Sequence, residues 1–408
     1  MALDSEEFQQ RRLQRQQRRK EKKRKKILIF AGVLAAVAII ATLIVILVGV
    51  IKDAGKNPAE ETTAPPTTVI HLAAAGDLNA TAGVINSGGV GYDYTNTFLD
   101  VAPLLADADV TVLNFEGNLF GQPYGADFSA PQSLMESLKK IGVDMVQLAN
   151  SYSIYKGMEG LAATVNGVRA AGLTPLGAYA TADEAKSGKG YTIHEVEGVK
   201  IAFVAFTKGM DGMALPAGSE SCVNVLYTDY ASTYQTVDTE GITKVLDRVN
   251  KEKPDLIIAM LHWGSEYNDT FSTTQQEIAE LMQEKGVDAI IGTHSHFVQK
   301  MELDKETGQF IAHSLGDFIS EGQRSGTEYS VILDLEITKN LLTGDTKITN
   351  YRYTPIFSVR EEGKPLRVVR LETAMEAYED GYIDKITPES FDAMAYALER
   401  IKARVLGG

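Results

Sequence analysis

Two hydrophobic periods alternate along most of the chain, and they predict strands and helices in turn. Short apolar runs, such as residues 110–114 and 256–261, have the length and β-branched composition of buried strands. Longer segments between them, such as residues 239–250, place apolar residues three and four positions apart, as amphipathic helices do. Strands that alternate with helices favour an α/β domain with mostly parallel strands.

The pattern of apolar and polar residues changes in the last quarter of the chain. After His313, long strand-like runs at 329–337 and 347–357 predict an antiparallel addition to the sheet, or a second sheet packed on it. A final helix is expected over 388–404, with Thr387 as its N-cap and Pro388 at its first position. The expected elements before this region are strand 69–75, helix 98–106, strand 110–114, helix 133–141, strand 145–148, helix 158–171, strand 200–206, helix 239–250, strand 256–261, helix 274–285 and strand 289–291.

An uninterrupted apolar segment lies near the N-terminus. Residues 27–51 carry no charge and follow the basic cluster 22–26. About 20 apolar residues cross a bilayer, so we expect a transmembrane helix. It exceeds the roughly 7–15 apolar residues of a secretory signal and has no evident cleavage site, so we expect a retained anchor. The positive-inside rule places residues 1–26 in the cytoplasm and the rest outside the cell membrane.

The segment after this anchor predicts a linker and then a domain. Residues 52–68 contain three prolines and no apolar periodicity, which is typical of an extended linker. Residues 69–408 are therefore expected to form an extracytoplasmic domain. Its single cysteine, Cys222, excludes an internal disulfide and a cysteine-based zinc cluster, and we expect a small buried side chain there.

Charge is distributed unevenly between the two ends of the chain. Residues 1–26 hold 11 Lys and Arg against 4 Asp and Glu, whereas residues 52–408 hold 29 against 50. The excess of acidic residues over 52–408 repels nucleic acid and anionic membrane surfaces, and it can attract cations. We therefore expect no nucleic-acid partner.

Side chains with metal-binding chemistry follow the expected strands at their carboxyl ends. Ligands bind at this edge of an open α/β sheet. His294 and His296 follow strand 289–291, and a His-x-His pair on an extended segment puts both rings on one side, close enough for one metal ion or two adjacent ones. The ends of four other expected strands carry Asp77, Glu116, Asn150 and His262.

Together these residues form a set of oxygen and nitrogen ligands suited to a divalent transition metal or a metal pair. Each also has an ordinary explanation, as a turn residue, a solvated carboxylate or a loop histidine. Their shared location favours the metal interpretation, since the ordinary one needs several independent coincidences. Nearby aromatic residues could stack on a chain-like ligand or simply pack at the rim. These are Tyr92, Tyr94, Trp263 and Tyr267.

The stretches around these residues resemble a known family. They are Gly-Asp77, Asn-Phe-Glu116, Leu-Ala-Asn150, His262-Trp-Gly-Ser-Glu-Tyr, Gly-Thr-His294-Ser-His296-Phe-Val-Gln and Ser314-Leu-Gly-Asp317-Phe-Ile. In this order they resemble the motifs of the bacterial capsule synthesis (CapA, poly-gamma-glutamate capsule) family, over about residues 69–320. That family is similar in fold to the calcineurin-like metallophosphoesterases. The resemblance implies a metallophosphoesterase-like four-layer α/β sandwich with mixed sheets.

The resemblance also implies a site and partners. It makes Asp77 a ligand of one metal and Glu116 the bridging carboxylate, with His262 and His294 on the other metal and His296 returning to the first. It implies one or two divalent ions, such as Mn, Fe or Zn. The implied partners are an anionic cell-surface polymer or its precursor, and capsule-assembly proteins.

Two departures from the family pattern bear on activity. The phosphoesterases have Asp-x-His where this chain has Asp77-Leu-Asn79, so one imidazole is missing. The third motif, usually Leu-Ala-Asn-Asn-His, reads Leu-Ala-Asn150-Ser151-Tyr152 here. Ser151 replaces the metal-binding carboxamide, and Tyr152 replaces the imidazole that would protonate a leaving group, so these are the candidate catalytic positions. A tyrosine with a pKa of about 10 exchanges protons poorly at neutral pH.

Three functions follow from these observations, and the sequence does not decide whether the chain is an enzyme. The first is a membrane-anchored, metal-dependent hydrolase or transferase acting outside the cell on a phosphoester or amide linkage. The second is a catalytically degenerate relative that binds a surface polymer or partner without turnover. The third is a surface scaffold with structural histidines. Metal content separates the third from the others, and turnover separates the first two.

Overall fold

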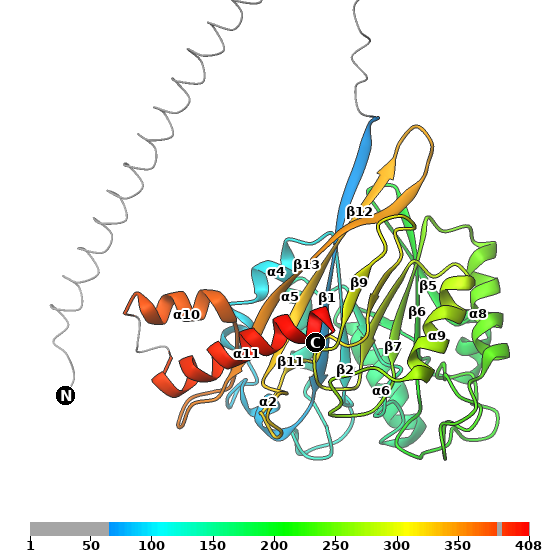
Figure 1. The fold of residues 1–408 in the computed structure, drawn as a ribbon. Helices are drawn as coiled ribbons and strands as arrows, with labels where there is room; N and C mark the ends of the chain where they lie inside the picture. The colour runs from blue at the N-terminus through cyan, green and yellow to red at the C-terminus, as the bar shows by residue number, and fades with distance from the viewer. Residues whose placement is uncertain (1–64, 382–385, 408) are drawn as a thin grey trace, which may run out of the picture. The chain divides into compact units, whose positions relative to one another are not determined.

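Two mixed β-sheets form the centre of the computed structural model, which describes residues 65–381 and 386–407 (Figure 1). The eight-stranded sheet has the order β14 (Arg367–Arg370), β13 (Thr346–Val359), β12 (Tyr329–Asn340), β1 (Thr67–Asn79), β2 (Val110–Glu116), β3 (Met145–Gln147) and β4 (Thr174–Leu176), and β11 (Asp317–Ile319) also pairs with β1. The six-stranded sheet has the order β5 (Tyr191–Val196), β6 (Val199–Thr207), β7 (Leu256–His262), β8 (Ala289–Thr293), β10 (Phe310–Ala312) and β9 (Met301–Leu303).

Each sheet combines a parallel centre with antiparallel edges. In the first, β1 to β4 and β11 are parallel, and β12, β13 and β14 add in antiparallel fashion. In the second, β6, β7, β8 and β10 are parallel, and β5 and β9 are antiparallel edges. The prediction of a mixed-sheet α/β fold is confirmed, and the late strands join the first sheet rather than forming another.

The described helices connect and cover these strands. They are α2 (Ala82–Asn86), α3 (Thr95–Phe98), α4 (Ala102–Ala106), α5 (Gln132–Lys140), α6 (Gly157–Ala170), α7 (Ala182–Gly188), α8 (Thr239–Lys251), α9 (Thr273–Glu284), α10 (Leu371–Glu379) and α11 (Pro388–Leu406). As expected, Thr387 caps α11 by accepting a hydrogen bond from the Ser390 backbone. The α11 helix crosses β12 and β13 on one face of the first sheet (Figure 1).

Alternating side chains of the central strands face two different layers. In β6, Ile201 and Phe203 belong to a large core shared with the first sheet, whereas Ala202 and Val204 belong to a second core with α8 and α9. In the first sheet, the Thr111 hydroxyl faces away from the second sheet and donates to a carbonyl oxygen of α4. The two sheets therefore pack face to face, and helices cover their outer faces.

The expected helix over residues 98–106 is wrong in one respect. The structure has two short helices there, α3 and α4, and Pro103 lies in the first turn of α4. Proline has no backbone N–H, so it fits a first turn but not a helix interior. The other expected elements are present with boundaries shifted by a few residues, and β1 runs on through Gly76 to Asn79.

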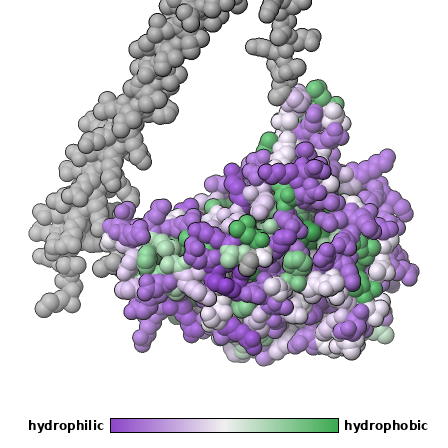
Figure 2. All heavy atoms as spheres, in the orientation of Figure 1, coloured by the Kyte–Doolittle hydropathy of each residue, from purple (hydrophilic) through white to green (hydrophobic). Residues whose placement is uncertain are grey.

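The predicted transmembrane segment, residues 27–51, lies outside the described residues. Within residues 65–381 and 386–407, no helix is both long and apolar enough to cross a membrane. The face shown in Figure 2 is mostly hydrophilic, with hydrophobic side chains in small separate areas. Cys222 is buried and free, as expected.

Candidate metal centre

The carboxyl ends of β1, β2, β7 and β8 meet where the two sheets face each other. Glu116 ends β2, and its neighbour on the same face, Asn114, reaches across the gap between the sheets. His262 ends β7, and its ring meets these side chains from the second sheet. Asp77 lies beside Asn114 in the β1–β2 pairing. The packing of the two sheets thus brings together residues far apart in the sequence.

Two buried carboxylates form the floor of the site. Asp77 Oδ1 accepts a hydrogen bond from Asn114 Nδ2 at 2.7 Å, and its Oδ2 accepts one from the His294 backbone at 3.0 Å. The same Asn114 amide donates to Glu116 Oε1 at 3.1 Å. The Asn114 side chain therefore holds the two carboxylates at a fixed distance from each other.

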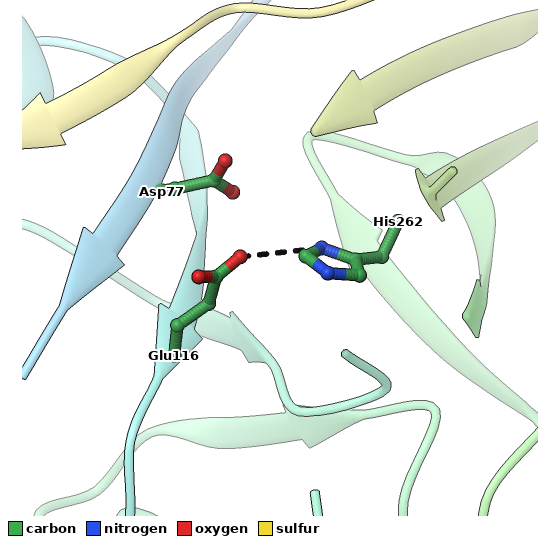
Figure 3. A group of neighbouring side chains, drawn as sticks. All are labelled: Asp77, Glu116 and His262. Atoms are coloured by element: carbon green, nitrogen blue, oxygen red, sulfur yellow. Dashed lines mark ion pairs between the residues drawn. The ribbon is translucent and has the colours of Figure 1, made fainter. Parts of the chain in front are cut away.

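The His262 ring is oriented by groups at both of its nitrogens. Its Nδ1 lies 3.4 Å from Glu116 Oε1 and 3.1 Å from the Thr293 hydroxyl, and its Nε2 lies 3.1 Å from the Ser151 hydroxyl. Figure 3 shows Asp77, Glu116 and His262 pointing towards one another from three different strands. Such contacts at both nitrogens fix the plane of the imidazole.

His294 and His296 follow β8 in a loop, so the expectation of an extended segment is wrong. Both have positive φ angles, 88° and 59°, which are uncommon for residues with a side chain. The turn still brings the rings together, with centroids 6.4 Å apart, and puts His294 4.4 Å from the His262 ring. His296 Nδ1 lies 2.7 Å from Asp317 Oδ1 and 3.8 Å from Asp77 Oδ2.

Two groups of potential ligands share Asp77. The first is Asp77, Glu116 and His262, and the second is Asp77, His296 and Asp317; within each group the ligand atoms lie within 4.8 Å of one another. Among the described residues, the ion pairs of these three carboxylates are all with histidine. Buried carboxylates without a lysine or arginine partner are costly unless a cation is bound. The donor set therefore fits one or two divalent ions.

The pKa values of the site reflect this clustering. Burial, together with the charge of Asp317, raises the pKa of Asp77 to about 6, although His296 and two hydrogen bonds oppose the shift. Burial and the charge of Asp77 raise the pKa of Glu116 well above its ordinary value. Burial and the other histidines hold the pKa of His262 well below its ordinary value, which keeps the ring neutral and able to act as a ligand.

The third-motif residues lie at the rim of these groups. Asn150 donates both amide hydrogens, to Asn114 Oδ1 and to the Phe115 carbonyl, and its Oδ1 accepts from the Tyr152 backbone. This bonding gives Asn150 a positioning role behind Asn114, and its predicted role as a ligand stays a prediction. Burial, with the charge of Glu116, raises the pKa of Tyr152, which makes it a still weaker acid.

The aromatic residues expected near the pocket differ in their exposure. Trp263 and Tyr94 are completely buried, and their polar atoms donate to the His313 and Ile85 carbonyls, so neither can stack on a ligand. Tyr267 is half-buried and stacks on His296 at 5.2 Å. Of the aromatic residues proposed from the sequence, it is the one that touches a predicted ligand.

Sequence reasoning missed three residues of the site as participants. Asn114 could have been found, because it lies two positions before Glu116 and so shares its face of β2. Asp317 was visible only as part of a family motif, and β11 brings it to Asp77. Thr293 carried no signal, since its role depends on the pairing of β8 with β7.

A model of a known protein family matches most of the domain that contains these residues. The family model of the bacterial capsule synthesis protein PGA_cap matches residues 71–322. The chain belongs to this family. The matched range contains every residue of both ligand groups.

Two relatives carry related names. The capsule biosynthesis protein CapA of Bacillus anthracis is 26% identical over 258 residues, which are 61% of this chain and 59% of that protein. The PGA biosynthesis protein CapA of Bacillus subtilis strain 168 is 25% identical over 249 residues, 60% of this chain and 61% of that protein. The match thus spans about three fifths of the length of each relative.

A solved structure with some similarity is the calcineurin-like phosphoesterase YfkN from Bacillus subtilis. It is 15% identical, with a TM-score of 0.43, and the match covers 82% of this chain and all of that one. A TM-score below 0.5 is too low to support an inference about the fold.

Proposed function

We propose that this chain is a membrane-anchored extracytoplasmic protein that acts in the synthesis or processing of a capsule or other cell-surface polymer, of poly-gamma-glutamate type, through a metal centre. The observation that carries the metal centre is the position of Asp77, whose buried carboxylate belongs to two ligand groups. Family membership supports the role in capsule synthesis. The apolar segment 27–51 and its basic flank support the anchor and its orientation.

The same proposal includes a metallophosphoesterase-like fold, a four-layer α/β sandwich. It is supported by two face-to-face mixed sheets with helices outside, and by ligand residues at the strand ends. Nitrogen and oxygen donors of this kind suit Mn, Fe or Zn. A divalent ion, when bound, would supply Lewis acidity and lower the pKa of a water molecule.

The residues of the chain have distinct tasks in this proposal. Asn114 keeps Asp77 and Glu116 close together despite their like charge. Asp317 Oδ1 and His296 Nδ1 lie 2.7 Å apart, and both residues belong to the second group, so the two side chains would bind the same ion. Ser151 contacts His262 Nε2, so it can orient that ring.

A second candidate, a polymer-binding module without turnover, is favoured by the third motif. An acid for the leaving group is typically worth about 100- to 10,000-fold in rate. Tyr152 stands where that acid is expected, and its raised pKa makes it unsuitable at neutral pH. The metal centre is common to both candidates, so turnover is what distinguishes them.

Metal analysis of the purified full chain tests the proposal. We expect bound divalent metal in the wild type and loss of the ion of the first group in His262→Ala, because that group then keeps only two ligands. His194→Ala, on β5, is the matched control and should keep its metal. A wild-type chain that binds no divalent metal, or a His262→Ala variant that keeps it all, would contradict the proposal.

A further inference from the structure

A pocket opens beside the second ligand group, and six segments of the chain line it. Its volume is about 110 Å³, and His296 and Asp317 line its inner end. Thr81, Tyr152, Tyr267 and Arg324 are among the residues that line the rest. A small group that enters this pocket would lie next to the metal ligands.

Arg324 is held in the wall of this pocket by stacking. Its guanidinium carbon lies 4.1 Å from the centre of the Tyr267 ring, and Tyr267 stacks in turn on His296. The Tyr267 backbone N–H donates to the Ser295 carbonyl, which ties the stack to the loop between the two histidines. The Tyr267 ring thus lies between the Arg324 guanidinium and His296, a potential ligand of the second group.

The charge of Arg324 has no partner within the described part of the chain, where its guanidinium forms neither an ion pair nor a hydrogen bond. Its loop is ordered nonetheless, because its carbonyl accepts hydrogen bonds from the backbone and hydroxyl of Thr327. A stacked arginine keeps its planar donor edge free for an oxyanion. Arg324 is exposed, and the pocket that it lines gives an anion access to this edge.

A second polar group of the pocket also lacks a partner. The Thr81 hydroxyl is buried and makes no hydrogen bond within the described residues. Buried hydroxyls are almost always hydrogen-bonded, and a ligand oxygen in this pocket would give this hydroxyl a partner. This observation is independent of Arg324.

Three carboxylates, those of Glu266, Asp317 and Glu321, also line the pocket. Asp317 belongs to the metal-binding group and pairs with His296. Glu321 packs against Gly83 of α2, where an added Cβ would overlap its carboxylate. Glu266 and Arg324 are both exposed, so solvent screens the charges of both.

We propose that this pocket is a subsite for an oxyanion of the substrate, a carboxylate or a phosphate, with Arg324 as its specificity-determining residue and the Thr81 hydroxyl as a second donor. The inference rests on the proposed function, because it places the oxyanion beside the group that reacts at the metal centre. A polymer with a charged group on each unit would be held in register by such a contact. The planar fork of arginine can bind either kind of oxyanion in bidentate fashion.

Calorimetric binding to the metal-loaded full chain in detergent tests the subsite. The probes are a γ-glutamyl tetramer, its amide analogue without side carboxylates, and glycerol 3-phosphate. We expect Arg324→Gln to raise the Kd of the preferred anionic probe about tenfold or more, and Arg324→Lys to have an intermediate effect. Whichever anionic probe binds the wild type more tightly identifies the oxyanion as carboxylate or phosphate.

Controls separate this inference from the proposed function. Arg352→Gln, which alters an exposed arginine on β13 paired with Asp334, should leave the Kd unchanged. Metal content, measured on the same samples, should be the same in all variants, since Arg324 is outside both ligand groups; a wild type without metal would overturn the proposed function itself. The subsite is overturned by an equal Kd in the wild type and Arg324→Gln, by an amide analogue that binds as tightly as the preferred anionic probe, or by no binding of either anion.

Discussion

Asp77 accepts hydrogen bonds from the Asn114 side chain and the His294 backbone, while its carboxylate belongs to both ligand groups. These bonds come from two different sheets, so Asp77 joins the two halves of the site. Such a residue is held in place before any ion binds. Preorganised ligands bind metal more tightly, because less conformational freedom is lost on binding.

At the scale of single residues, proton and metal compete for Asp77. Burial raises its pKa to about 6, so the carboxylate is mostly protonated below that pH and cannot act as a ligand. We expect metal affinity to fall as pH falls through about 6, by up to about tenfold per pH unit for one displaced proton. Competition with a chelator between pH 5 and 8 measures this. An affinity that is constant from pH 5 to 7 would contradict the assignment of Asp77 as a ligand.

The same pKa predicts the pH dependence of the metal-free protein. The folded chain holds the Asp77 proton up to about pH 6, whereas the unfolded chain releases it near 3.8. The contribution of Asp77 to stability is therefore present below about pH 4 and lost as pH rises through 6. Bound metal should reverse this trend, since it binds the deprotonated form.

The third motif gives the sharpest test of turnover. We expect the native chain to hydrolyse generic phosphodiesters weakly, and Ser151→Asn combined with Tyr152→His to raise the rate at least about tenfold by restoring an acid and a ligand. The Tyr152 ring packs against the Phe128 ring with centroids 4.2 Å apart, so the competing outcome is a loss of packing. Tyr155→His, in the same aromatic cluster, is the control.

Two results of that experiment would contradict the prediction. Lower stability of the double variant with no gain in rate would make Tyr152 a packing residue. An ordinary phosphoesterase rate in the native chain, lost in Tyr152→Phe, would make Tyr152 the acid itself.

At the scale of elements, Gly76 matters because of close approach rather than because of a turn. The β1 strand continues past it, and an added Cβ would overlap the Gly316 carbonyl oxygen just before β11. We expect Gly76→Ala to lower the free energy of unfolding by about 1–3 kcal/mol, and to reduce metal binding, because β11 carries Asp317. Thermal unfolding and metal content measure the two effects. Gly91→Ala, where a Cβ meets no atom within 4 Å, is the control; equal effects of the two changes would contradict this reason.

The strands of the fold were predictable where their sequence is continuous and apolar. Residues 256–261 carry the signal of a buried strand without reference to the rest of the chain. Short strands such as β11, with three residues, have too few positions for a period to appear. The antiparallel pairing of β12 with β1 was expected only as one of two possibilities, because periodicity does not specify a partner.

The candidate site was predictable in its residue types and only partly in its geometry. Strand ends located Asp77, Glu116 and His262 correctly in one place. The left-handed backbone at His294 and His296 could not be predicted, because nothing in their side chains requires it. It follows from the packing of the loop, in which the His294 backbone donates to Asp77.

At the scale of the whole molecule, β1 has two distinct ends. The described chain enters the domain at the first residue of β1, and the candidate metal centre lies near its last residues. Thr67 begins β1 and Asp77 lies about 33 Å further along it, at about 3.3 Å per residue. The Leu341 backbone at the β12–β13 turn donates to Pro66, so this turn marks the entry end. The candidate metal centre thus lies far from Thr67, at the other end of β1.

The charge step across residues 27–51 predicts how the chain is exposed on cells. We expect a protease added to intact cells to cut within the linker, and to release a soluble fragment that begins after Lys52. Mass spectrometry of the released fragment identifies the cut. Recovery of the fragment from lysed cells alone would contradict the proposed orientation.

The central claim is that Asp77 joins two ligand groups into one metal centre, and the metal stoichiometry of Asp77→Asn tests it most directly. The variant keeps the volume of the side chain and removes the charge that both groups share. We expect one or two divalent ions per chain in the wild type and in the exposed control Asp345→Asn, and loss of most of this metal in Asp77→Asn. Wild-type stoichiometry in a folded Asp77→Asn variant would contradict the claim.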